Sequence, residues 1–286
     1  MSLQEGECLL SSMNSSNKLI LKQIAHSYGF SIIKIRPCPS LYKNVAAFRV
    51  STNKGNYMIK PFIGSQGRLF RLSSYASRLR RKGFRGMPKW LKTRSGKHWV
   101  KKRGKLYYVT EWIEGRDILS NKEELAKLGV VLAKLHSVSR SFGLPPRSDS
   151  LVRELKKRHA AFCSQTKVLR SKSSKAGTWS QHRGEQCMKL GWDALESLKA
   201  ERIRSRLQKE SRQQPLVHGD VTIPNALKSK ERIYLIDWDA MKPGSAYLDL
   251  VVALTNTTEF NPSNMAAFLS GYEQVRPLTR SEKKLI

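Results

Sequence analysis

Acidic residues are nearly absent from the first 110 residues of this 286-residue chain. No Asp or Glu lies between Cys8 and Thr110, so residues 1–110 carry 23 basic and 2 acidic side chains, a net charge of +21. Residues 111–286 carry 30 basic and 20 acidic side chains, a net charge of +10, which recovers the total of +31. The shortage means that no residue from 8 to 110 can supply a carboxylate. Because the composition changes at Glu111, we predict a domain boundary there.

Cysteine is scarce and scattered. The four cysteines are Cys8, Cys38, Cys163 and Cys187. None forms a C-x-x-C pair or has a His at ligand spacing, which argues against a zinc site and against a disulfide framework. We expect reduced thiols.

Long apolar runs are also missing. No window approaches the roughly 18 consecutive apolar residues of a membrane helix, and Glu5 and Glu7 stand where a secretory signal has basic residues. We therefore expect a soluble, cytoplasmic protein without a membrane span. A hydrophobic content of 40% is enough to bury the core of one large domain or of two lobes.

The two parts of the chain differ in periodicity. Helical spacing predicts a short helix over 17–27 and a basic helix over 68–81, and alternating runs predict strands. The predicted strands cover 31–35, 46–51, 57–62, 89–93, 98–100 and 106–111. Beyond Glu111 the pattern is helical, with a capping box from Ser120 to Glu123, a leucine stripe over 125–135, and helices over 150–163 and 181–207 around a surface loop at 171–176. The fold class is α+β.

The most informative segments are two polar motifs late in the chain. Their sequences are His218-Gly219-Asp220-Val221-Thr222-Ile223-Pro224-Asn225 and Ile236-Asp237-Trp238-Asp239. Apolar strands precede Asp220 and Asp237, so both carboxylates are expected at strand ends beside one cleft. Phosphoryl transfer needs a carboxylate to accept a hydroxyl proton, oxygen ligands for magnesium and a cation on the donor phosphates. Asp220 suits the first role, and Asn225 and Asp237 suit the second.

These motifs resemble the signature of the aminoglycoside phosphotransferase and choline kinase superfamily. Further segments extend the resemblance over nearly the whole chain: Tyr57 to Lys60, the Gly83-Phe84 turn, the Thr93 to Lys97 hairpin, Glu111 to Gly115 and Tyr247 to Leu250. This layout looks most like the bacterial spore-coat kinase-like proteins of the CotS type. The resemblance implies a bilobal protein-kinase-like fold, with an antiparallel N-terminal lobe and one main helix over 1–110, a hinge over 111–116 and a helical C-terminal lobe over 117–286.

The resemblance also implies roles for single residues. Asp220 would be the catalytic base, Asn225 and Asp237 the magnesium ligands, and Lys60 the contact to the phosphates of ATP. The remaining implied nucleotide contacts are the hinge backbone of Glu111, Trp112 and Ile113 and the apolar floor of Leu227 and Ile236.

Three further residues are expected to support the site. His218 is predicted to hold its loop by a hydrogen bond. Asp239 is either an accessory metal ligand or a structural hydrogen-bonding residue, and Asp249 is a buried cap or loop anchor.

Departures from the family pattern leave the activity open. In active kinases a carboxylate on the helix after the lysine strand holds that lysine, but the predicted helix over 68–81 has none, and Gln66 is the nearest polar residue. Either Lys60 is oriented by Asp237 and the phosphates alone, or nucleotide binding is weak. The segment from Pro39 to Asn44 replaces a glycine-rich phosphate loop, and the short C-terminus suggests a truncated or naturally short version.

Three functions remain open from the sequence. The first is a magnesium-dependent ATP phosphotransferase with an unknown hydroxyl acceptor. The second is a catalytically weak or inactive structural protein of the spore coat, with other coat proteins as partners. The third is a polyanion-binding protein, because the residues between Arg78 and Lys105 are densely basic.

Overall fold

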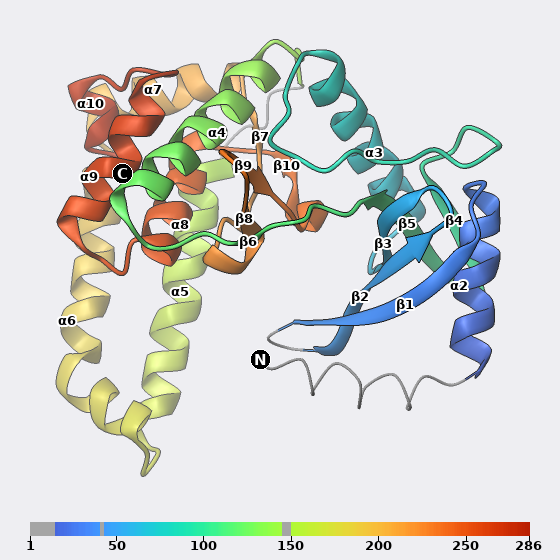
Figure 1. Ribbon diagram of the computed structural model, residues 1–286. Coiled ribbons are helices and arrows are strands. Elements are labelled where there is room, and N and C mark those ends of the chain that lie inside the picture. Colours follow the sequence, from blue (N-terminus) through green and yellow to red (C-terminus); the bar gives the residue numbers. More distant parts are fainter. Residues whose placement is uncertain (1–14, 41–42, 145–149) are drawn as a thin grey trace. The chain divides into compact units, whose positions relative to one another are not determined.

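The computed structural model describes residues 15–40, 43–144 and 150–286 (Figure 1). The chain divides into two compact units. The first comprises residues 1–120 together with 222–240, and the second comprises 121–221 together with 241–286. Residues 222–240, which the prediction assigned to the C-terminal lobe, therefore pack with the first unit. Within the described residues, no helix combines the length and the apolarity that crossing a membrane requires.

An antiparallel sheet forms the centre of the first unit. Its strand order is β1-β2-β3-β5-β4. The strands are β1 (Ile32–Ser40), β2 (Lys43–Thr52), β3 (Gly55–Phe62), β4 (Trp99–Lys102) and β5 (Lys105–Glu111). Of the segment from Pro39 to Asn44, residues Leu41 and Tyr42 lie outside the described residues.

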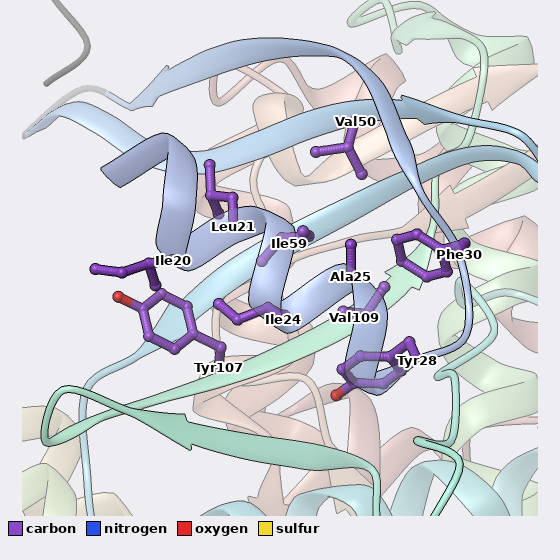
Figure 2. Packing of buried hydrophobic residues seen from close by; sticks show 10 residues of the cluster. All are labelled: Ile20, Leu21, Ile24, Ala25, Tyr28, Phe30, Val50, Ile59, Tyr107 and Val109. Atoms are coloured by element: carbon purple, nitrogen blue, oxygen red, sulfur yellow. The ribbon is translucent and has the colours of Figure 1, made fainter. Parts of the chain in front are cut away.

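Helix α2 (Ser15–Ser27) covers one face of this sheet (Figure 2). Its buried residues follow the helical spacing that the sequence predicts: Ile20, Leu21, Ile24 and Ala25. They pack against Val50, Ile59 and Val109 from β2, β3 and β5. Removal of this apolar surface from water is the main force that holds the helix on the sheet.

Helix α3 (Gln66–Arg81) follows β3. The Ser65 side chain caps its N-terminus by accepting the Arg68 N–H group, and Gly83, with a φ of +85°, forms the predicted turn at its end. The predicted strand over 89–93 is reduced to a single bridge between Trp90 and Thr110. Residues 105–108 of β5 pair with β4, so only the last residues of β5 remain for this segment.

A small sheet completes the first unit. Its order is β6-β8-β9, formed by β6 (Arg116–Asp117), β8 (Ala226–Ser229) and β9 (Arg232–Leu235). The backbone N–H of Ile118 donates to the Ala226 carbonyl at 2.9 Å. This pairing places the 222–240 segment in the same unit as the larger sheet.

The second unit is helical. Its elements are α4 (Lys122–Arg140), α5 (Ser150–Arg170), α6 (Lys175–Ser197), α7 (Glu201–Arg212), α8 (Ala246–Thr257), α9 (Pro262–Glu273) and α10 (Arg280–Lys283), with the strand pair β7 (Leu216–Val217) and β10 (Lys242–Pro243). The predicted helix over 181–207 is two helices, and no Pro or Gly marks the break. The predicted loop over 171–176 is shorter, because α6 already begins at Lys175.

Side chains cap α4 and α10 of this unit at their N-termini. The capping box predicted at Ser120 is wrong by one residue: Asn121 is the N-cap, and its side chain accepts the Glu124 N–H. Asn is as good a cap as Ser, which explains why spacing alone could not separate them. At the start of α10, Thr279 and Glu282 form a reciprocal capping box.

Helices α4 and α9 approach closely through glycine. A Cβ atom on Gly129 would lie 2.1 Å from the carbonyl oxygen of Phe268, and one on Gly271 would lie 2.0 Å from that of Ala126. Both neighbours are helix backbone and cannot rotate away. The leucine stripe of α4 is buried on the same helix, as the sequence predicts.

We expect Gly129→Ala to lower the free energy of unfolding by about 1–3 kcal/mol, because the added methyl group forces the two helices apart. Chemical denaturation monitored by circular dichroism measures the change. Gly67→Ala is the matched control: it also lies in a helix, but its nearest contact is the end of the flexible Arg71 side chain at 3.8 Å. Equal stability of the two variants would contradict the close approach.

Candidate functional site

Lys60 lies on β3 within an acidic pair contributed by the 222–240 segment. Its ammonium nitrogen is 2.5 Å from Oδ1 of Asp237 and 3.0 Å from Oδ2 of Asp239. The lysine side chain is only 11% exposed, so its charge needs partners within the protein. The structure therefore joins a residue of the acid-free part of the chain to two carboxylates far away in sequence.

The two carboxylates also determine the charge state of Lys60. Burial by itself lowers the pKa of the ammonium group, but the negative charges of Asp239 and Asp237 outweigh burial and raise the pKa of Lys60 above its ordinary value. The side chain is therefore a fixed positive charge at neutral pH.

Asn225 and Asp237 are neighbours across the β8–β9 hairpin. The N–H of Ile236 donates to the Asn225 carbonyl at 2.9 Å, which extends the pairing of Ala226 with Leu235. Asp237 has a φ of +57°, a conformation that costs energy for a residue other than glycine and is common at functional sites. The turn thus presents an amide and a carboxylate from adjacent positions.

This donor set fits a magnesium ion that is shared with a nucleotide. Magnesium prefers oxygen ligands and is commonly held by one or two carboxylates plus waters and substrate phosphates. Asn225 and Asp237 supply side-chain oxygens, and the Asp237 carboxylate is 42% exposed. In the described part of the chain, no three His, Cys, Asp or Glu side chains form a complete metal cage, so phosphates would have to complete the coordination.

Asp239 is held from three directions. In addition to Lys60, the hydroxyl of Tyr108 donates to its Oδ1 at 2.8 Å, and Arg68 donates to its backbone carbonyl at 2.6 Å. The Tyr108 ring stacks on Trp90 with centroids 4.3 Å apart. Burial, together with the charge of Asp239, raises the pKa of Tyr108 well above its ordinary value, so the hydroxyl stays a proton donor.

The predicted hinge is partly engaged within the first unit. The Glu111 N–H donates to the Lys89 carbonyl, and the Trp112 N–H donates to the Asn56 carbonyl. The contact of the hinge backbone with a nucleotide base stays a prediction, and these two N–H groups already have backbone partners within the first unit. The remaining candidates for contact with a base are the carbonyls of Glu111 and Trp112 and the backbone of Ile113.

The predicted apolar floor comes from the same hairpin. Leu227 lies on β8 opposite Tyr234, and Ile236 precedes Asp237. Both side chains are half-buried. They belong to the same unit as Lys60 and the hinge residues.

Asp220 belongs to the second unit, on a loop held by Asp249. The Asp249 carboxylate accepts the backbone N–H groups of His218 and Gly219, both at 2.8 Å. The Asp220 N–H lies 3.3 Å from Nδ1 of His218, whose side chain is fully buried, while Asp220 is exposed. Asp249 and His218 thus hold the backbone N–H groups from His218 to Asp220.

His136 on α4 supports the same carboxylate. Its Nε2 lies 3.1 Å from Asp249, and its Nδ1 lies 2.8 Å from the Tyr272 hydroxyl. Burial lowers the pKa of His136 more than Asp249 raises it, so the imidazole is neutral at pH 7 and donates a hydrogen bond through Nε2. For Asp249, burial raises the pKa but the hydrogen bonds to its charged form prevail, so the pKa lies below its ordinary value.

Sequence reasoning missed the residues that act through these contacts. Tyr108 reads as an ordinary strand residue, and His136 reads as one polar residue beside a leucine stripe. Tyr272 and Arg68 also carry no motif. The one available signal was the position of His136 directly after Leu135 of the leucine stripe. An imidazole buried there requires hydrogen-bond partners, which would have pointed to a polar network around His136.

Solved structures of kinases share this fold. The aminoglycoside phosphotransferase from Alicyclobacillus acidocaldarius has a TM-score of 0.79 at 18% identity, covering 92% of this chain and 80% of that chain. The amicoumacin kinase hAmiN, in complex with AMP-PNP, Ca2+ and Ami, has 0.67 at 16%, covering 98% and 84%. The choline kinase LicA from Streptococcus pneumoniae has 0.56 at 19%, covering 95% and 85%. The predicted kinase-like fold is confirmed.

A family model agrees with the structural likeness. No curated protein matches this chain. The model described as the phosphotransferase enzyme family, APH, matches residues 35–282 and so includes Lys60, Asp220 and Asp237. The chain belongs to the phosphotransferase enzyme family.

Proposed function

We propose that this protein is a magnesium-dependent phosphotransferase that moves the γ-phosphate of ATP to a hydroxyl acceptor. The observation that carries the proposal is the contact of the Lys60 ammonium with Asp237, 2.5 Å apart, on the hairpin that also presents Asn225. A fixed cation beside an oxygen donor set is what a nucleotide triphosphate and its metal require. The nucleotide named in the hAmiN complex, AMP-PNP, supports ATP as the donor class.

Each residue then has one task. Lys60 neutralises charge on the donor phosphates, and Asn225 and Asp237 hold magnesium, which spreads the negative charge of the phosphates when it is bound. Asp220 accepts the proton of the acceptor hydroxyl. The oxygen of that hydroxyl forms a bond to the γ-phosphorus while the bond between the γ-phosphorus and ADP breaks. His218 and Asp249 keep the Asp220 loop in shape.

The direct test uses purified wild-type protein. Magnesium and ATP together should raise its melting temperature, because a ligand that binds only the folded state stabilises that state. Labelled phosphate should pass from ATP to one member of a panel of small hydroxyl compounds and proteins. Absence of both effects would remove the proposal.

A finer assignment is a place among the CotS-type spore-coat proteins, which localises the chain to the cytoplasm of a sporulating cell or to the coat. Its support is the order of the turn at Gly83 and the hairpin from Thr93 to Lys97, combined with a helix that has no carboxylate. If the role were purely structural, Asp220→Asn would leave coat assembly unchanged. Loss of assembly, with normal folding and incorporation of that variant, would count against a structural role.

A second candidate function is binding of a polyanion by the first unit. Arg81 and Lys82 at the end of α3, and Lys101, Arg103 and Lys105 around the β4–β5 turn, are exposed. Binding that depends on their charge weakens steeply as the salt concentration rises, because the release of counterions from the polyanion then becomes less favourable. A flat dependence of DNA affinity on salt would rule this mode out.

A further inference from the structure

Lys60 has no carboxylate partner on α3, the helix that follows its strand. Helix α3 carries no Asp or Glu, and its last turn adds Arg78, Arg80 and Arg81. Lys60 is nevertheless almost buried and fully paired. The counter-charge that fixes it therefore comes from elsewhere in the fold.

Asp239 has the geometry of a dedicated partner. One carboxylate oxygen, Oδ2, lies 3.0 Å from the Lys60 nitrogen, and the other, Oδ1, accepts the Tyr108 hydroxyl at 2.8 Å. Both oxygens are thus engaged on side chains of the sheet. This arrangement favours the structural hydrogen-bonding role of Asp239 over the role of accessory metal ligand, because a metal at either oxygen would compete with the positive charge of Lys60 or with the Tyr108 hydroxyl.

Tyr108 is a rigid support for this carboxylate. It lies directly opposite Lys60 in the β3–β5 register, so both side chains emerge on one face of the sheet. Its ring is fully buried and stacked on Trp90 at an interplanar angle of 3°. The hydroxyl therefore has little freedom, and it aims the Asp239 carboxylate at Lys60.

Helix α3 contributes a positively charged side chain, and not a carboxylate, to the contacts that hold Asp239. The Arg68 guanidinium donates to the backbone carbonyl of Asp239 at 2.6 Å. The Trp238 ring, which is buried against Phe84 with a centroid distance of 6.0 Å, holds the preceding residue of the turn. The position of Asp239 is thus determined by backbone as well as by side-chain contacts.

We propose that Asp239, held by Tyr108, is the positioning residue for Lys60 and replaces the carboxylate that helix α3 lacks. Asp237 is then available to the metal, since Lys60 keeps one carboxylate partner when Asp237 turns away. The inference rests on the proposed function, because it assigns Lys60 to the phosphates of ATP. The proposal predicts that the Tyr108 hydroxyl affects the binding of the phosphates although it does not contact the nucleotide.

The test measures calorimetric affinities for magnesium–ATP and for adenosine in wild type, Asp239→Asn, Tyr108→Phe and Lys60→Ala. The ratio of the two affinities isolates the part contributed by the phosphates. We expect Asp239→Asn to lower this ratio about tenfold and Tyr108→Phe about threefold, with unchanged affinity for adenosine. Tyr107→Phe, on the opposite face of β5 beside α2 (Figure 2), is the matched control and should leave the ratio unchanged.

Double variants show whether the effect passes through Lys60. In the Lys60→Ala background, Asp239→Asn and Tyr108→Phe should cause no further change, because residues that act as one unit are not additive. Tyr108→Phe keeps the stacked ring, so it remains informative if Asp239→Asn does not fold. The magnesium concentration for half-saturation should be the same in Tyr108→Phe, Asp239→Asn and wild type.

Three outcomes overturn the inference. A shift of the magnesium half-saturation in Asp239→Asn alone would make Asp239 a metal ligand. Unchanged ratios in Asp239→Asn and Tyr108→Phe, with a lowered ratio in Lys60→Ala, would leave the proposed function standing without this positioning role. A wild-type protein that binds adenosine as tightly as magnesium–ATP would remove the proposed function itself, and the role of Asp239 with it.

Discussion

Asp220→Asn is expected to lower the rate of phosphate transfer from ATP by about 10²–10⁴-fold, the usual contribution of a general base. Asn has the same shape as Asp but cannot accept the proton of the acceptor hydroxyl. The loop should keep its conformation, because Asp249 holds it through the backbone of His218 and Gly219. The rate is measured with labelled ATP and either an identified acceptor or water.

The affinity for magnesium–ATP separates this effect from damage to the site. It should stay at the wild-type value in Asp220→Asn, since the variant leaves Lys60, Asn225 and Asp237, the residues proposed to bind the phosphates and the metal, unchanged. Asp193→Asn makes the same chemical change at an exposed position of α6 and should leave the rate unchanged. Transfer by Asp220→Asn at the wild-type rate would exclude Asp220 as the base.

Asp249→Asn is expected to lower the free energy of unfolding by about 3–5 kcal/mol, the typical loss when one partner is removed from a buried charged network. The Asp249 carboxylate is 2% exposed and accepts from two backbone N–H groups and from His136. An amide at this position has one acceptor atom in place of two and turns its NH2 group toward a donor. Buried donors without a partner cost about 1–3 kcal/mol each.

Denaturant unfolding of wild type and Asp249→Asn at pH 7 measures this loss. Asp193→Asn serves again as the control, since substitutions at exposed positions usually change stability by less than about 0.5 kcal/mol. A loss in Asp249→Asn that does not exceed this control would mean that the network through His136 and Tyr272 contributes little to stability.

The candidate metal ligands and the candidate base could be named from the sequence because these residues lie close together in the chain. Asn225 follows Asp220 by five positions, and Asp237 follows a continuous apolar run from Ile233 to Ile236 that is typical of a buried strand. The leucine stripe of α4 and the first strands were predictable for the same reason: local periodicity carries the information.

The support for Lys60 was not predictable in this way. The sequence showed that residues 8–110 cannot offer a carboxylate, but the pairing with Asp239 joins positions 179 apart, as 239 − 60 shows. That contact depends on strand register, on the stacking of Tyr108 against Trp90 and on the turn at Asp237, none of which leaves a local pattern. The same holds for His136, whose partner Asp249 lies on another helix.

Calorimetry of Asp237→Ala shows whether the β8–β9 hairpin and Lys60 bind a nucleotide through a metal. ATP affinity is measured with magnesium and with a chelator in wild type and in the variant. Loss of supporting groups around a metal costs about 10–100-fold in affinity, so loss of a ligand should reduce magnesium-supported ATP binding by about 100-fold and abolish its dependence on magnesium. Equal magnesium dependence in Asp237→Ala and wild type would contradict the account.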